Sequence, residues 1–104
     1  MLGRRRFHDV IQRQLDLFAA DEAASLAEAE EADAAWTNAQ RDEAEELYGD
    51  YQLVVDALAE QLYEVREAFA SSLDERTADQ YRAAFSRAAL KRFRRFSGFL
   101  GEDE

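Results

Sequence analysis

Two pairs of glutamates at helical spacing are the residues best suited to chemistry in this sequence. Glu43 and Glu46 form one Glu-x-x-Glu pair, and Glu64 and Glu67 form another. Carboxylates three residues apart lie on the same side of a helix, and two such pairs on facing helices can hold Mg²⁺. Helical spacing, however, places Glu64 and Glu67 opposite the apolar stripe of their own helix, where we expect both to be solvated. We therefore predict no catalytic residue, no metal and no other cofactor, and keep the four glutamates as alternative metal ligands.

This pattern resembles the all-α nucleotide pyrophosphohydrolases of the MazG type, which carry Glu-x-x-Glu followed by Glu-x-x-Asp. The segments from Glu45 to Asp50 and from Lys91 to Phe96 add to the resemblance. The second pair of this chain ends in Glu67, where that family has Asp. The resemblance implies an alternative function as a Mg-dependent nucleotide pyrophosphohydrolase.

Other forms of catalysis find little support in the residue types. His8 is the single histidine, and the chain contains no cysteine. A histidine- or cysteine-rich metal site and a nucleophile paired with a base are therefore not indicated. We expect His8 to be solvated beside Asp9 at the start of a helix.

The composition predicts that nearly the whole chain is helical. The sequence has 104 residues, many of them Ala, Glu and Arg, and it contains no proline. These residues favour helix, and a chain of this length supports one modest core. We predict an all-α fold with a single domain over residues 1–104, whose ends at 1–5 and 101–104 we expect to be mobile.

One apolar stripe dominates the second half of the chain. From Ala44 onward, apolar residues recur at steps of three and four within a sector of about 100°, which is typical of an amphipathic helix. They are Leu47, Tyr51, Val54, Val55, Leu58, Leu62, Val65 and Phe69. Gly49 lies opposite the stripe, so we expect the helix to continue through it.

We predict an antiparallel bundle of three long helices, over about 5–35, 38–72 and 75–99. Thr37 begins a possible capping box for the second helix, and Thr77 or Asp74 could cap the third. The first helix has an alternative: Asp21 or Ser25 could restart it, which would give four helices with a split near residues 20–25.

The second predicted helix is too long for its neighbours to cover. Its 35 residues span about 50 Å, whereas the last helix has about 25 residues. We therefore predict a homo-oligomer, with a coiled-coil dimer favoured and a monomeric bundle with overhanging ends as the alternative. The predicted interface residues are Trp36, Tyr51, Val55, Leu58, Leu62, Val65, Phe69, Phe93 and Phe96.

Trp36 also carries a second resemblance. A chain of about a hundred residues with Trp between two helices is similar to the helical-hairpin substrates of type VII secretion, whose turn reads Trp-x-Gly. Here the turn reads Trp36, Thr37, Asn38, and the export signal of that family resembles the segment from Tyr63 to Glu67. The resemblance implies a helical hairpin with Trp36 at its turn.

Charge is strongly segregated along the sequence. The net charge is −10, yet the last predicted helix is basic and carries Arg87, Lys91, Arg94 and Arg95. We weigh three roles for this basic surface: pairing with the acidic faces of residues 28–67, binding nucleic acid or an anionic membrane, and binding a protein partner. The negative net charge disfavours nucleic acid, because most of the surface would repel a phosphate polymer.

These observations together predict a small, non-catalytic helical module that mediates self-association and protein–protein interaction. The longest apolar run, Leu17 to Ala20, is far shorter than the ~20 residues that span a bilayer, so we predict no transmembrane segment. The absence of cysteine and of a visible N-terminal export signal favours the cytoplasm.

Overall fold

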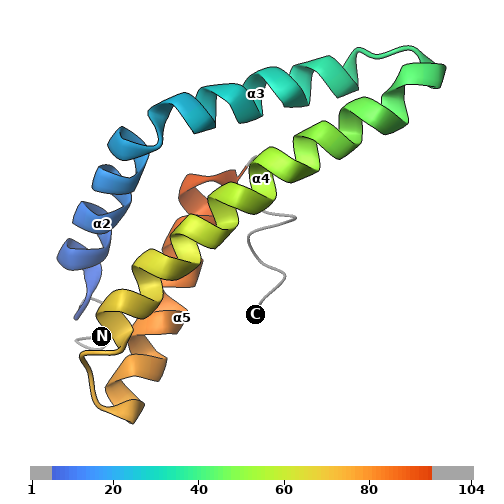
Figure 1. The fold of residues 1–104 in the computed structure, drawn as a ribbon. Helices are drawn as coiled ribbons and strands as arrows, with labels where there is room; N and C mark the ends of the chain where they lie inside the picture. The colour runs from blue at the N-terminus through green and yellow to red at the C-terminus, as the bar shows by residue number, and fades with distance from the viewer. Residues whose placement is uncertain (1–5, 95–104) are drawn as a thin grey trace.

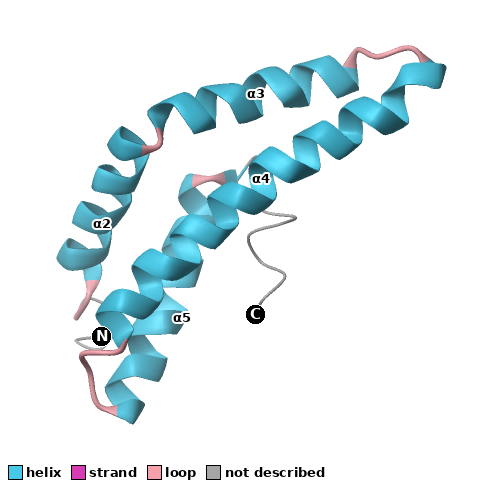
Figure 2. Cartoon of the chain, viewed as in Figure 1, coloured by secondary structure: helices cyan, strands magenta, loops and turns pink. Residues whose placement is uncertain are grey.

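The computed structural model describes residues 6–94, most of which are helical. Figure 2 shows helices joined by short loops, and no strand occurs among these residues. The prediction of an all-α chain is confirmed. The helices are α2 (His8–Asp21), α3 (Ala23–Thr37), α4 (Arg41–Ala70) and α5 (Glu75–Arg92).

The first predicted helix is divided into α2 and α3, so the three-helix layout was wrong and the four-helix alternative is confirmed. The break lies at Glu22, whose φ of −106° and ψ of 24° depart from helical values. Its amide still donates to the carbonyl of Phe18 at 2.8 Å, so the chain changes direction without losing this hydrogen bond. Neither Asp21 nor Ser25 caps the new helix; Glu22 precedes it without a side-chain cap.

The long helix α4 begins three residues later than predicted. Thr37 is the last residue of α3 rather than the cap of α4, and Gln40 precedes α4 without a side-chain hydrogen bond. The predicted Thr37 capping box was therefore wrong. Gly49 lies within α4, and a Cβ built on it would meet nothing within 4 Å, which confirms that its side faces open space.

The turn before α5 covers residues 71–74, close to the predicted boundary between a helix that ends at about 72 and one that begins at about 75. Asp74 is the residue that caps α5: its carboxylate accepts a hydrogen bond from the amide of Thr77 at 3.3 Å. The hydrogen bonds from Thr77 lower the pKa of Asp74 below its ordinary value. The described part of α5 ends at Arg92, and the predicted continuation over 95–99 lies outside the described residues.

The four helices form an elongated molecule with extents of 50 × 24 × 23 Å. In Figure 1, α3 runs antiparallel to the first half of α4 and forms an arm with it. The chain bends at Glu22, so that α2, which precedes the bend, lies with α5 beside the second half of α4. We call α3 with residues 41–55 the arm, and α2, α5 and residues 56–70 the compact end.

The apolar stripe of α4 is covered by its own chain. Tyr51, Val55, Leu58 and Leu62 are all buried, at no more than 5% exposed. These four are core residues rather than the exposed interface residues that the sequence predicted. The reason is the break at Glu22: α3 covers the first half of α4, and the differently directed α2 joins α5 over the second half, so shorter helices together cover the long one.

The remaining predicted interface residues are partly covered. Trp36, Val65, Phe69 and Phe93 are half-buried and pack against the core. Phe69 contacts the ring of Tyr81 at 4.7 Å between centroids, and Phe93 meets Phe18 edge-on at 5.6 Å. Phe96 lies outside the described residues.

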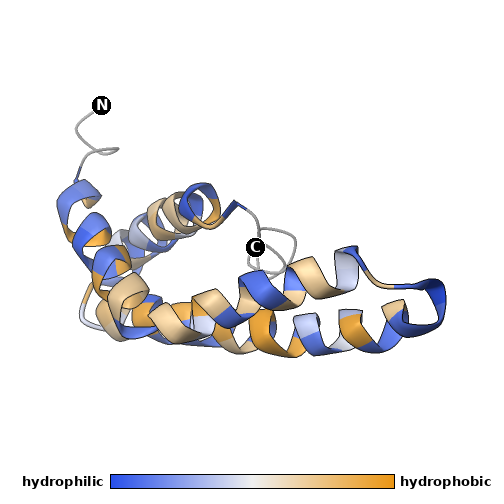
Figure 3. Ribbon diagram, turned by 90° about the horizontal axis from the view of Figure 1, so that it is seen from above, coloured by the Kyte–Doolittle hydropathy of each residue, from blue (hydrophilic) through white to orange (hydrophobic). Residues whose placement is uncertain are grey.

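Hydropathy colouring shows how apolar residues are distributed along the helices. In Figure 3, blue and orange alternate around the helices of the arm, as expected for helices with one apolar side. Three large apolar side chains of the described residues are exposed: Leu17 at 58%, Leu53 at 71% and Tyr63 at 47%. None of the described helices is long and apolar enough to cross a membrane.

Candidate functional site

The two glutamate pairs do not converge. Glu43, Glu46 and Glu64 are exposed, and no group of three His, Cys, Asp or Glu side chains suited to a metal ion occurs among residues 6–94. The geometry in this range therefore gives no support to the glutamates as a set of metal ligands.

Glu67 is ion-paired and only 28% of its side chain is exposed, whereas the sequence predicted a solvated carboxylate. Arg82 of α5 donates to both of its carboxylate oxygens, at 2.9 Å and 3.0 Å, and Arg66 donates to it at 3.0 Å. The hydrogen bond from Arg82 is the largest cause that lowers the pKa of Glu67. Arg66 also donates to the buried hydroxyl of Ser86 at 2.8 Å. Glu67 thus joins α4 to α5, and its oxygens are already used.

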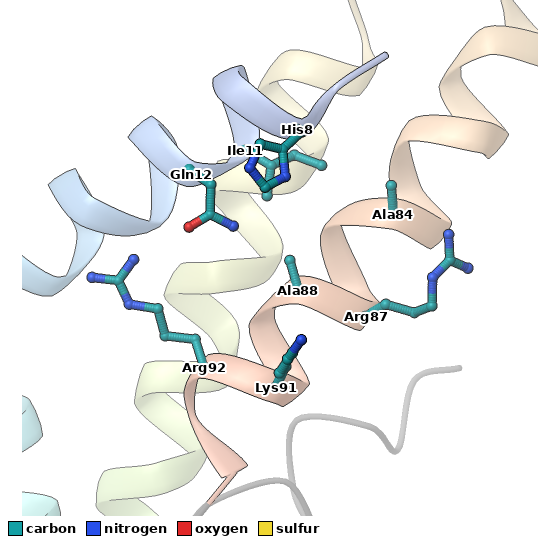
Figure 4. Close-up of a pocket in the computed structure, with 8 residues that line it drawn as sticks. All are labelled: His8, Ile11, Gln12, Ala84, Arg87, Ala88, Lys91 and Arg92. Carbon is teal, nitrogen blue, oxygen red and sulfur yellow. The ribbon is translucent and has the colours of Figure 1, made fainter. Parts of the chain in front are cut away.

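A groove between α2 and α5 brings basic side chains together. Its volume is about 1020 Å³. From α2, His8 and Gln12 reach toward α5, while Arg92 extends back toward α2 and Arg87 lies at the outer edge (Figure 4). The lining residues are His8, Ile11, Gln12, Ala84, Arg87, Ala88, Lys91 and Arg92.

Helical spacing explains why these residues share one groove. His8, Ile11 and Gln12 stand at steps of three and four on α2, so they face the same way. Ala84, Arg87, Ala88 and Lys91 repeat this spacing on α5. Ile11 is only 2% exposed and, with the two small alanines, gives the groove an apolar floor between polar edges.

Two side-chain contacts hold α2 against α5 beside the groove. The hydroxyl of Tyr81 donates to Gln14 Oε1 at 2.7 Å, and Arg92 forms an ion pair with Asp16 at 2.6 Å. Burial raises the pKa of Tyr81 to about 12. The apolar core beneath these contacts, which includes the edge-on pair of Phe7 and Tyr81 at 5.5 Å, fixes the separation of the two helices.

The charged side chains that line the groove, Arg87, Lys91 and Arg92, are all basic. None of its described lining residues is acidic, although the chain has 23 Asp and Glu against 13 Lys and Arg. Asp16 pairs with Arg92, but neither Arg87 nor Lys91 forms an ion pair within residues 6–94. Neighbouring cations without carboxylates favour an anionic ligand.

The sequence identified part of this surface and missed the rest. Arg87 and Lys91 line the groove, whereas Arg94 is exposed beyond it and Arg95 lies outside the described residues. Of the three roles weighed for this surface, pairing with acidic faces is not seen for Arg87, Lys91 or Arg94 within residues 6–94. Arg82 and Arg66 make that kind of contact instead, through Glu67.

His8, Gln12 and Arg92 were the residues that sequence reasoning overlooked. His8 was expected to be solvated, and it is exposed, but it faces basic residues of α5 across the groove. The steps from His8 to Ile11 and Gln12 indicated a common face. Nothing in the linear pattern indicated that this face lies beside α5.

Trp36 lies at the other end of the molecule, near the α3–α4 turn. Its ring meets Tyr48 edge-on at 4.9 Å and lies 6.2 Å from Tyr51. Its buried Nε1 has no hydrogen-bond partner among the described residues. Trp36 is thus an anchor within the arm. The neighbouring Asn38 has a φ of −97°, so this turn does not use a left-handed residue.

Comparisons of the chain with protein-family models, curated proteins and solved structures return no match.

Proposed function

We propose that this protein is a non-catalytic helical module that acts by association and holds an acidic protein partner in the groove between α2 and α5. One observation carries the proposal: two helices bring His8, Arg87, Lys91 and Arg92 to one hollow that no acidic residue of the described chain lines. In a chain of net charge −10, the composition alone would favour a mixed or acidic lining.

The chemistry of the groove suits a polypeptide better than a nucleic acid. Its apolar floor of Ile11, Ala84 and Ala88 can cover aliphatic side chains, while its cations pair with carboxylates. A phosphate polymer would have to approach a surface whose net charge repels it. No side chain in the groove is arranged as a nucleophile with a base, which supports binding rather than catalysis.

Self-association belongs to the same proposal. The buried stripe of α4 no longer supports it, but Leu17 and Leu53 remain more than half exposed in a single chain. We propose a homo-oligomer, with a dimer favoured and with the helices of each copy packed as a bundle. The absence of cysteine suits the reducing cytoplasm, which we propose as its compartment.

A labelled decaglutamate peptide tests the groove directly. Fluorescence anisotropy at low salt should show binding that weakens as salt is added, because screening reduces the attraction between exposed charges. The double variant Arg87→Glu/Lys91→Glu should bind the peptide at least about tenfold more weakly, a loss of about 1.4 kcal/mol or more.

The matched control is Arg41→Glu/Arg76→Glu, which changes the net charge by the same amount at exposed positions outside the groove. We expect this control to bind the peptide nearly as well as the parent. Equal losses in both variants would show that overall charge, not the groove, governs binding. If the protein binds a DNA duplex or anionic lipid vesicles more tightly than the peptide, that ligand, and not an acidic protein, is the partner of the groove.

A further inference from the structure

The outward face of α4 has the opposite character to the basic groove. Leu53, Ala57, Glu60 and Glu64 are all exposed and fall within about 60° on the helix. Leu53, at 71% exposed, is the most exposed large apolar side chain of the described residues. The face therefore presents an apolar centre followed by two carboxylates one turn apart.

A shallow hollow beside this face adds further acidic groups. It lies between α3 and α4, has a volume of about 350 Å³, and includes Leu53, Ala57 and Glu60. Glu22 and Glu28 line it from the other side. The two hollows thus have opposite charge: this one has glutamates at its edge, and the groove between α2 and α5 has arginines and lysine.

The spacing of the charges also matches between the two surfaces. Arg87 and Lys91 stand four residues apart on α5, and Glu60 and Glu64 stand four residues apart on α4. Pairs at this spacing lie one helical turn apart, so two helices side by side can bring both glutamates opposite both cations. In the parallel alignment that places Glu60 opposite Arg87 and Glu64 opposite Lys91, Ala57 falls opposite Ala84 of the groove floor, and these two small residues let the helices approach closely.

We infer that the occupant of the basic groove is the outward face of α4 from a second copy of this chain. Glu60 pairs with Arg87 and Glu64 with Lys91, Ala57 packs on Ala84 of the apolar floor, and Leu53 lies one helical turn before Ala57 at the end of the contact. The inference rests on the proposed function and names the partner of the same groove. Every copy carries both surfaces on different helices. A symmetric dimer therefore makes the contact twice, whereas a head-to-tail arrangement leaves one surface of each kind free to bind further copies.

A charge-swap experiment tests this contact. Sedimentation velocity at low salt should show the parent chain associating with increasing concentration, and added salt should weaken the association. The groove variant Arg87→Glu/Lys91→Glu and the face variant Glu60→Lys/Glu64→Lys should each associate at least tenfold more weakly. A mixture of the two variants should associate again, because each reversed surface then meets its complement.

Recovery in the mixture also shows that both variants are folded. The matched control for the face variant is Glu30→Lys/Glu31→Lys, which reverses two exposed charges on α3 and should leave association unchanged. A parent chain that stays monomeric at millimolar concentration would overturn the inference. So would association that persists in the groove variant, or a mixture that stays monomeric.

The peptide titration separates this inference from the proposed function. Decaglutamate that binds the groove of a monomeric parent would retain the acidic partner of the proposed function, and would overturn both the proposed self-association and the second copy as that partner. A parent chain that neither binds the peptide nor associates would overturn both.

Discussion

The arm and the compact end are built from similar helices but are covered very differently. Of the fourteen buried apolar residues in the described chain, only Ala29, Tyr51 and Val55 belong to the arm, whereas ten belong to the compact end and Phe7 directly precedes it. Ala29 is the only buried residue of α3. Each part of the arm has one neighbouring helix, whereas α2, α5 and the second half of α4 shield one another.

This difference shows that the number of covering helices, more than helix propensity, decides local stability. The alanine-rich α3 forms a helix readily and lies close to α4, but alanine side chains bury little apolar area. Regions with few buried contacts open more easily than the rest of a protein. We therefore expect the arm to open at lower cost than the compact end.

The largest expected effect comes from removing a core side chain at the compact end. Leu15 is 0% exposed, so Leu15→Ala should destabilise the protein by about 2 to 5 kcal/mol through lost burial and a cavity. Leu26 of α3 is half-buried, and Leu26→Ala should cost less than about 2 kcal/mol. Urea unfolding of both variants measures the difference. Equal losses would contradict the contrast between the two regions.

The second expected effect is an alkaline loss of stability at the compact end. Burial raises the pKa of Tyr81 from its ordinary value of 10.0 to about 12. The folded state therefore favours the neutral phenol: its contribution is complete below pH 10 and is lost as the pH rises through 12. Two pH units correspond to about 3 kcal/mol.

Unfolding curves at several alkaline pH values test this prediction with Tyr81→Phe. The variant loses the hydrogen bond to Gln14, so its free energy of unfolding should be about 1 kcal/mol lower than that of the parent at neutral pH. It should also show a smaller fall in stability between pH 10 and 12 than the parent. The same fall in both proteins would show that ionisation of Tyr81 does not cause the loss of stability at alkaline pH.

The smallest expected effect is a gain of stability in the arm. Gly49 lies inside α4, and the side chain of an alanine at this position would point into open space, so Gly49→Ala should stabilise the protein by up to about 1 kcal/mol. The corresponding rise in melting temperature is about 4 °C. The reverse change at an exposed helical site, Ala57→Gly, should lower it by a similar amount in dilute solution. A fall with Gly49→Ala would show that something occupies this space.

Much of the local structure was readable from the sequence. The stripe from Leu47 to Phe69 predicted the long helix, and the Asp74 cap was one of two alternatives for the last. The position of the break at Glu22 was harder to predict, because Asp21 and Ser25 are typical helix-capping residues and neither caps α3. Its cause lies in packing: the bend lets the residues before it pack against α5, while the residues after it cover the first half of α4.

The candidate groove was only partly readable for the same reason. Arg87 and Lys91 could be recognised as a basic surface, but His8 and Gln12 are about eighty positions away in the chain. Periodicity tells which residues share a helix face and does not tell which face of another helix lies opposite.

By itself, the sequence determined the helical class, the apolar side of α4, the segregation of charge and the absence of cysteine chemistry, because these follow from residue type and spacing along the chain. Only the tertiary structure decided that the stripe of α4 is covered within one copy, that Glu67 is held by Arg82, and that the basic residues of α5 share a groove with His8 and Gln12 of α2. These outcomes depend on the direction each helix takes after a turn, and that direction is set by how the apolar faces pack together.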